Sequence, residues 1–156
     1  MRGGADNARV TNPRQSDLRA AVDRWSDGWA RGWATHDVDL VASLYADDAV
    51  HVSAFFRDPQ PTAEYAAWAF SDEQEAEVWF AEPVVEDDRA AVAWWAISRG
   101  VDGRDTTLAG ISDLRFGPDG LVIWQRDYWN SAEDSATPPP GDWGPAAAHE
   151  GGGGSG

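Results

Sequence analysis

DVDLVASLYADDAVHV, residues 37–52 of a 156-residue chain, is the stretch that decides the fold. Asp37 can cap a short helix by accepting a hydrogen bond from a free amide of the first turn. Apolar side chains then recur at helical spacing, at Val38, Val41, Leu44 and Tyr45. Asp47 and Asp48 interrupt this period as a tight acidic turn, and residues 49–56 have strand character. The sequence therefore predicts a capped helix, a turn and a strand that enters a core.

A longer helix is expected before this unit, from Ser16 or Asp17 to about Ala34. One face of it carries apolar side chains at spacings of three and four, namely Leu18, Val22, Trp25, Trp29 and Trp33. Gly28 and Gly32 weaken this helix by about 1 kcal/mol each relative to alanine. We expect them to leave room for the indoles, although a close neighbour or a ligand would also need small residues there.

The remainder of the chain predicts one more helix and then a meander of strands. Residues 57–61 form a loop, Thr62 can cap a third helix, and residues 71–77 are an acidic connector. Aromatic and β-branched runs follow at 78–85, 90–99, 106–116 and 121–130, with hairpin turns at 101–105 and 117–120. This order predicts an α+β fold with three N-terminal helices packed on a strongly curved, mixed, mostly antiparallel sheet.

Domain boundaries follow from composition. We expect a flexible N-terminal arm over residues 1–14, one folded domain over 15–130, and a flexible Pro/Gly-rich tail over 131–156. Met1 to Asn12 contains no hydrophobic segment of the kind found in signal peptides. The tail contains Trp143, which either folds back onto the domain or is free.

Charge and composition exclude several classes of function. The formal net charge of −15 disfavours nucleic-acid backbones and anionic membrane surfaces as partners. The chain has no cysteine, which removes thiolate chemistry and is consistent with a cytoplasmic location. All 12 basic residues are arginine, so Schiff-base chemistry on a lysine is excluded. No apolar run is long enough to span a membrane.

Two motifs give the chain a family resemblance. The helix–turn–strand unit of residues 37–52, and Gly120 followed by Arg126-Asp127-Tyr128-Trp129, resemble the SnoaL-like, or NTF2-like, family of cone-shaped folds. The resemblance covers roughly residues 18–130. It implies that Asp127 on the last strand points into a pocket as an acid/base group and that Trp129 lines the same pocket. It also implies a homodimer through the outer sheet face, where we expect Trp94, Trp124 and Tyr128.

The chain departs from the characterised activities of this family. The positions of the ketosteroid isomerase machinery are occupied by Trp29, Ser53 and Ser112. The Arg-x-Asp pair that epoxide hydrolases carry on a middle strand is replaced by Ala93 and Trp95. The resemblance therefore implies the fold and a pocket, and neither of these two reaction schemes.

Asp127 and His51 are the candidate catalytic residues, because both are expected to point inward on strands that line one cavity. A carboxylate can hold an imidazole ring, and such a dyad can shuttle a proton near neutral pH. Alternatively, His51 is a core residue bonded to a backbone carbonyl, and Asp127 pairs with Arg126 or Arg115. The expected substrate-binding residues are Trp29, Trp33, Tyr45, Ser53, Trp95, Ser112 and Trp129.

No cofactor or metal is expected. The three histidines, His36, His51 and His149, are scattered along the chain, and His36 is explained by the C-terminal dipole of the first helix. Two functional hypotheses remain. The first is acid/base catalysis of the isomerase, cyclase, hydratase or lyase type on a small apolar or aromatic molecule held in a tryptophan-lined pocket. The second is a non-catalytic module that binds a hydrophobic ligand or serves as a dimeric scaffold.

Overall fold

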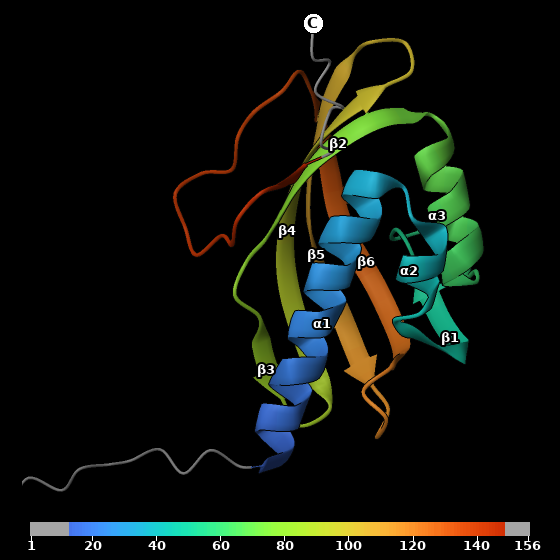
Figure 1. The fold of residues 1–156 in the computed structure, drawn as a ribbon, viewed down its shortest axis with the longest axis vertical. Coiled ribbons are helices and arrows are strands. Elements are labelled where there is room, and N and C mark those ends of the chain that lie inside the picture. The colour runs from blue at the N-terminus through green and yellow to red at the C-terminus, as the bar shows by residue number, and fades with distance from the viewer. Residues whose placement is uncertain (1–12, 149–156) are drawn as a thin grey trace, which may run out of the picture.

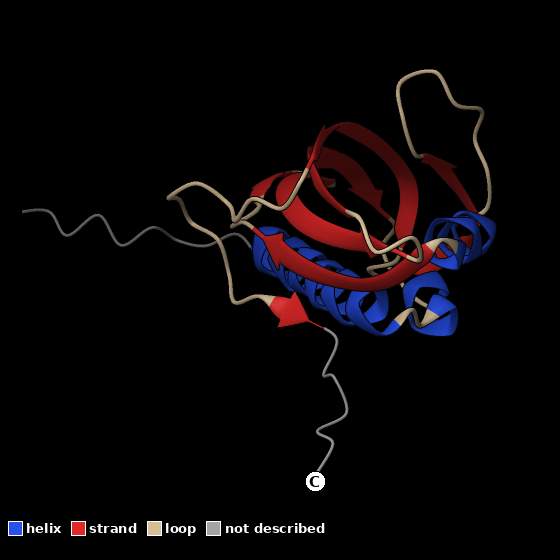
Figure 2. Cartoon of the chain, turned by 90° about the horizontal axis from the view of Figure 1, so that it is seen from above, coloured by secondary structure: helices blue, strands red, loops and turns tan. Residues whose placement is uncertain are grey.

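Three helices cover the concave face of one curved sheet in the computed structural model, which describes residues 13–148 (Figures 1 and 2). The helices are α1 (Pro13–Thr35), α2 (Val38–Ala42) and α3 (Thr62–Ser71). The predicted α+β class with three helices is confirmed. Within the described residues, no helix combines the length and the apolar character needed to cross a membrane.

The sheet has the strand order β1-β6-β5-β4-β2-β7, and β3 pairs with β4. Its strands are β1 (Tyr45–Val52), β2 (Glu73–Phe80), β3 (Val84–Glu86), β4 (Arg89–Gly100), β5 (Asp105–Phe116), β6 (Val122–Glu133) and β7 (Ala147–Ala148). β1 runs parallel to β6 and the other pairs are antiparallel, so the mixed sheet is as predicted. Figure 2 shows how the strands curl, with the helices on one side.

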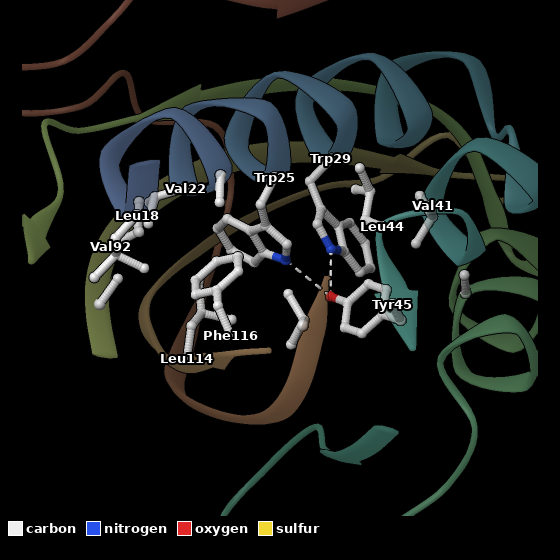
Figure 3. Packing of buried hydrophobic residues seen from close by; sticks show 14 of the residues in the cluster. Leu18, Val22, Trp25, Trp29, Val41, Leu44, Tyr45, Val92, Leu114 and Phe116 are labelled. Atoms are coloured by element: carbon white, nitrogen blue, oxygen red, sulfur yellow. Dashed lines mark hydrogen bonds between the residues drawn. The ribbon is translucent and has the colours of Figure 1, made fainter. Parts of the chain in front are cut away.

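The core lies between α1 and the sheet. Pro13 begins α1, where its missing N–H is no loss, and the apolar stripe expected on this helix is buried. Figure 3 shows Leu18, Val22 and Trp25 on the side of α1 that faces Leu114 and Phe116 of the sheet, and Trp29 pointing toward Tyr45. Burial of this stripe, rather than intrinsic helix propensity, stabilises a helix that contains two glycines.

The two glycines of α1 admit close neighbours, which is the alternative to packing room for the indoles. A Cβ on Gly28 would lie 2.7 Å from Leu44 Cδ1, and a Cβ on Gly32 would lie 2.5 Å from Val41 Cγ2. They therefore give room to α2 and to Leu44, which precedes β1. The bare backbone lets α2 lie directly against α1.

The unit at residues 37–52 is confirmed in outline and corrected at its boundary. Asp37 Oδ1 accepts a hydrogen bond from the Leu40 amide at 2.9 Å, as a helix cap should. Tyr45 begins the strand instead of ending the helix, and Asp47 and Asp48 lie within β1 instead of in a turn. The register of β1 against β6 shifts between Tyr45 and Val50, so the two acidic residues occupy an irregular part of the strand.

Two further boundaries differ from the prediction. β2 begins at Glu73, within the stretch expected to be an acidic connector. Thr62 is the first residue of α3 and not its cap; Pro61 holds the cap position. Backbone pairing with β4 extends β2 in spite of its many carboxylates, because the side chains of alternate residues can remain in water.

The chain after Asn130 has defined contacts. β6 continues to Glu133, and β7 pairs with the edge of β2. Trp143 packs edge-on against Trp95 with ring centroids 6.3 Å apart, and Trp95 Nε1 donates to the Ala136 carbonyl at 2.7 Å. Of the two alternatives for Trp143, the structure shows the one in which it folds back. That the tail is flexible stays a prediction, and residues 149–156 lie outside the described residues.

The outer face of the sheet carries exposed apolar side chains. Ile111 and Ile123 are both more than 40% exposed, and Trp124 and Tyr128 are half-buried. Trp94, expected on this face, instead points into the concave side, where it is buried. The homodimer through this face stays a prediction that now rests on a patch without Trp94.

Replacing Gly32 with alanine tests the close contact between α1 and α2. Helix propensity alone would make the variant more stable by about 1 kcal/mol. We expect the opposite sign, a loss of about 1–3 kcal/mol, because the new methyl group would overlap Val41, a stiff and fully buried side chain. Denaturant unfolding measures the difference. A more stable variant would contradict this expectation and show that α2 can move away from α1 at little cost.

Candidate active site

The register of the sheet brings the polar residues together. Residues directly opposite each other on neighbouring strands share a face. Ser112 of β5 lies opposite Asp127 of β6, and Gln125 lies opposite His51 of β1. Trp94, Gly110 and Trp129 form the next row toward the other end of the strands. The concave face therefore presents a polar cluster beside an aromatic one.

Asp127 lies at the centre of the polar cluster. Its Oδ1 accepts hydrogen bonds from Ser112 Oγ at 2.7 Å and from Gln125 Nε2 at 2.8 Å. Its Oδ2 lies 2.8 Å from His51 Nε2. Asp127 is only 5% exposed, yet each of its carboxylate oxygens has a hydrogen-bond partner. A buried carboxylate requires such partners, since an unpaired one would be very costly.

Donor-only indoles set the direction of this network. Trp25 Nε1 and Trp29 Nε1 both donate to Tyr45 Oη, at 3.0 and 2.7 Å (Figure 3). The Tyr45 hydroxyl must then donate onward, and its acceptor is Gln125 Oε1. That bond orients the amide so that Nε2 faces Asp127.

A second relay reaches the same carboxylate oxygen from β4. Trp94 Nε1 donates to Ser112 Oγ at 3.1 Å, so the Ser112 hydroxyl proton is directed at Asp127 Oδ1. Both relays begin at an indole N–H, which cannot accept. Asp127 Oδ1 is therefore the common end of two hydrogen-bond chains, and Oδ2 has only His51 as partner among the described residues.

His51 lies behind Asp127. Its ring is completely buried, and Thr62 Oγ1 lies 3.4 Å from its Nδ1. The ring stacks against Tyr45 with an interplanar angle of 15° and meets Tyr65 edge-on at 4.8 Å. The structure thus shows the contact between His51 and Asp127, and not the pairing of Asp127 with Arg126 or Arg115.

Two adjoining cavities lie over this network. The inner cavity, about 30 Å³, has Asp127, Ser112 and Gln125 among its walls. The outer cavity, about 250 Å³, is bounded mainly by aromatic side chains. Both cavities share four wall residues, which are Trp29, Trp33, Tyr65 and Trp94. The inner cavity has room for about one water-sized group, so the ring of a ligand belongs in the outer one.

An open groove lies beside the outer cavity. It has a volume of about 1090 Å³ and runs along the hairpin between β4 and β5. Asp127 does not belong to its wall. The groove meets the outer cavity at a shared border, formed by Ala69, Asp72, Glu73, Ser98 and Leu108.

The expected pocket residues divide into three groups. Trp29, Trp33, Ser112 and Trp129 line a cavity, and their role in substrate binding stays a prediction. Tyr45 and Ser53 are buried behind the walls, where the Ser53 carbonyl accepts from Trp129 Nε1 at 2.7 Å. Trp95 is a correction, since it lies on the opposite face of β4 against Trp143. Alternation defined the two faces of β4, but Trp94, not Trp95, is on the inner one.

Gly110 explains how the two indoles of the cavity floor fit together. A Cβ there would lie 2.6 Å from Trp129 Cβ and 2.9 Å from Trp94 Cζ2. Any side chain at this position would fill the space between the two rings. Glycine on a strand commonly marks such a close approach.

Glu73 was missed by sequence analysis. Its side chain is 7% exposed and lies 2.8 Å from His36 Nε2. Trp33 Nε1 donates to both carboxylate oxygens, at 2.9 and 3.1 Å, and the Ser98 hydroxyl donates to Oε2. His36 was attributed to the helix dipole, but its partner is this buried carboxylate. The sequence carried no signal for its burial, because Glu73 lies in an acidic run that is also typical of a solvated connector.

His36 has an unusual backbone conformation. Its φ is 55°, in the left-handed region, where a residue with a Cβ loses roughly 1–2 kcal/mol. The Asp37 amide bonds to the Gly32 carbonyl at 2.8 Å, which closes the end of α1. The ring also stacks on Phe70 with centroids 5.1 Å apart. Glycine would end the helix without strain, so ending the helix does not explain why a histidine occupies this position.

Two buried phenols border the polar network. Burial is the main cause that raises the pKa of Tyr45 far above its usual value, and the nearby Asp127 charge adds to it. Burial also raises the pKa of Tyr65, with a further contribution from the charge of Asp127. Both hydroxyl groups therefore keep their protons at every physiological pH and can donate hydrogen bonds.

A metal centre is not formed by the described part of the chain. Within residues 13–148, no three His, Cys, Asp or Glu side chains converge in a way that could hold an ion. His149 lies outside the described residues. The arrangement supplies proton donors and acceptors beside an aromatic cavity.

Comparison with known proteins agrees with this architecture. Residues 22–124 match the family model of the SnoaL-like domain. A search of curated proteins gives no match to the sequence.

Solved structures share the fold at low sequence identity. An NTF2-like protein of unknown function from Exiguobacterium sp. 255-15 is 19% identical, with a TM-score of 0.59 over 70% of this chain and 98% of that one. The epoxide hydrolase/cyclase-like enzyme SalBIII, which acts in pyran ring formation in the polyether salinomycin, is 15% identical, with a TM-score of 0.64 over 76% and 96%. An LEH-like epoxide hydrolase of M. tuberculosis is 15% identical, with a TM-score of 0.59 over 76% of this chain and 86% of that one.

Replacing Tyr45 with phenylalanine tests the buried phenol. The folded protein keeps the Tyr45 proton, whereas the unfolded chain loses it above a pH of about 10. Stability contributed by the neutral phenol is therefore present below pH 10 and falls as the pH rises above it. We expect the variant to be less stable by about 1–3 kcal/mol at pH 7, because Gln125 and two indoles lose a partner.

Measurements at alkaline pH distinguish the effect of the buried Tyr45 proton from a simple loss of packing in the variant. Above pH 10 the unfolding free energy of the variant should fall less steeply, by up to about 1.4 kcal/mol per pH unit. Denaturant unfolding between pH 9 and 11.5 measures both slopes. Equal slopes would contradict a buried phenol that keeps its proton.

Proposed function

The chain belongs to the SnoaL-like domain family, and on that premise we propose that it catalyses proton transfer on a small apolar or aromatic molecule, with Asp127 as the acid/base group. The observation that carries the proposal is a buried carboxylate, oriented by two hydrogen-bond relays, in the wall of a cavity that adjoins an aromatic pocket. Trp25 and Trp94 in the cavity wall, and Tyr45 buried behind it, form these relays and support the orientation of the carboxylate.

The chemistry needs no electron acceptor. Asp127 Oδ2 would accept a proton from a C–H or O–H bond of the substrate, and the bonding pair would remain on the substrate. The resulting carboxylic acid would return the proton to another atom of the same molecule. Return to carbon gives isomerisation, return to a leaving oxygen gives elimination, and transfer during ring closure gives cyclisation.

His51 would be a positioning residue. It belongs to the wall of neither cavity in the described chain, so it would act through Asp127. Its hydrogen bond fixes Oδ2, while Thr62 and the flanking aromatic rings fix the imidazole. Buried partners of this kind hold a reacting group within narrow limits, which is the main requirement for efficient proton transfer.

The cavity limits the substrate. A volume of about 250 Å³ is at the small end of ligand pockets and suits one ring or two fused rings. Tryptophan walls favour a flat, apolar ring. Two of the solved structures are described as epoxide hydrolase or cyclase-like enzymes, which supports acid/base chemistry on a related fold. The proposed reaction requires no cofactor. We also propose that the protein is a homodimer and is located in the cytoplasm.

A non-catalytic ligand-binding module is the second candidate. The small inner cavity favours it, because only a small group can reach Asp127. In that case the Asp127 network would be a rigid floor beneath the aromatic pocket. The two candidates differ in the effect of removing the carboxylate charge.

Asp127→Asn preserves the shape of the side chain and removes its ability to accept the proton. With 2-tetralone as a carbon-acid probe, we expect wild-type protein to accelerate deuterium exchange in D₂O, followed by NMR. The variant should lose at least about a hundredfold of that acceleration. Ligand affinity should remain within about tenfold, or 1.4 kcal/mol.

His51→Gln is the companion variant. It should lower the exchange rate less than Asp127→Asn and should move the pH dependence of the rate, because Oδ2 loses an imidazole partner. The binding-module alternative gives another result. There, Asp127→Asn would mainly lower stability, by about 3–5 kcal/mol for a buried pair, and no exchange would be seen with either protein.

A further inference from the structure

We propose that Glu73, held by His36, is a ligand-recognition site at the outer end of the cavity. The ligand would carry a hydrogen-bond donor, a hydroxyl or an ammonium group, remote from the atom that meets Asp127. The inference deepens the proposed function and shares with it the placement of the ligand in the outer cavity. Its chemistry is separate, since it concerns binding and not proton transfer.

The position of Glu73 is the first argument. Glu73 belongs both to the wall of the outer cavity and to the border of the open groove. Asp127 lies in the inner cavity instead. A ligand that enters from the groove passes Glu73 first and reaches Asp127 last. The two carboxylates are therefore placed at opposite ends of the same aromatic space.

The contacts of Glu73 are the second argument. His36, Trp33 and Ser98 supply its partners, and each of these side chains can donate. Trp33 shares a single proton between both carboxylate oxygens. A carboxylate has about four acceptor sites, so a ligand donor can take the site that this shared bond fills only in part. A ligand acceptor would be repelled there, because neighbouring Asp72 also borders the cavity. The site therefore selects donors, and among them favours a positive charge.

The conformation of His36 is the third argument. Its left-handed backbone is strained, and the end of α1 requires only a residue that tolerates this conformation. An imidazole adds a bond to Glu73 and a stack on Phe70. A strained residue that holds a buried carboxylate in a cavity wall is typical of a functional site.

Tyr65 links the two ends. It lines both cavities. Burial is the main cause that raises its pKa, and the charges of both Asp127 and Glu73 contribute. Tyr65 is therefore common to the part of the cavity that contains Glu73 and the part that contains Asp127, and a flat ring placed along it would lie between the two carboxylates.

The experiment compares three naphthalene probes of nearly equal size by calorimetry. 2-Naphthylmethylamine carries an ammonium group, 2-naphthol carries a hydroxyl group, and 2-methoxynaphthalene carries no donor. We expect wild-type protein to bind the amine at least about tenfold more tightly than the ether, with the naphthol between them, as for hydrogen bonds to a charged group. Glu73→Gln should remove most of the preference for the amine and leave ether binding within about twofold.

Two more variants separate the possible outcomes. Asp127→Asn should retain the preference for the amine, because its carboxylate lies in the inner cavity. His36→Asn keeps a residue that tolerates the left-handed backbone but cannot replace the imidazole, and should lower amine affinity several-fold. Its melting temperature shows that the fold survives.

Three results would overturn the inference. The first is equal affinity of wild-type protein for amine and ether. The second is a preference that disappears in Asp127→Asn and persists in Glu73→Gln, which would assign the donor to Asp127 and leave the proposed proton transfer intact. The third is failure of all three probes to bind at millimolar concentration, which would also remove the cavity from the proposed function.

Discussion

An indole N–H can donate a hydrogen bond and cannot accept one, and the polar interior of this protein is ordered by that constraint. Trp25 and Trp29 donate to Tyr45, which must pass its own proton to Gln125, and Trp94 acts on Ser112 in the same way. Every proton in these chains is directed toward Asp127. A hydroxyl and an amide, which could each be oriented in two ways, have one orientation here. The carboxylate therefore has a fixed set of hydrogen-bond partners, which are Ser112, Gln125 and His51.

The sequence was sufficient for the fold and for the main polar pair, because both rest on strong local signals. Residues 37–52 and the paired turns with Gly103 and Gly120 defined the elements, and the turns are confirmed by positive φ values at both glycines. Strand alternation assigned Asp127 and His51 each to one face of a strand, and the family resemblance identified that face as the inner one. The structure brings the two side chains into contact. Their roles in binding or catalysis stay predictions.

What could not be predicted has a common cause. Alternation assigns side chains to two faces but does not say which face is inside, so Trp95 was chosen where Trp94 belongs. The same limit applies to Glu73, because the register of β2 shifts between Glu73 and Glu75. A register shift of this kind changes which side chains point inward, and the residue pattern of this stretch does not predict the shift. The acidic run around Glu73 is what a solvated connector would also show.

The tryptophans have one consequence that concerns light and not chemistry. Trp25, Trp29, Trp33 and Trp94 form a row whose neighbouring ring centroids lie 6.5, 6.4 and 5.8 Å apart, each pair strongly inclined. Ultraviolet transitions of chromophores this close mix with one another. The circular dichroism of this protein therefore contains an exciton contribution from the walls of its cavity. Helix content read from such a spectrum would be biased, while the same signal would report directly on the geometry of the indoles.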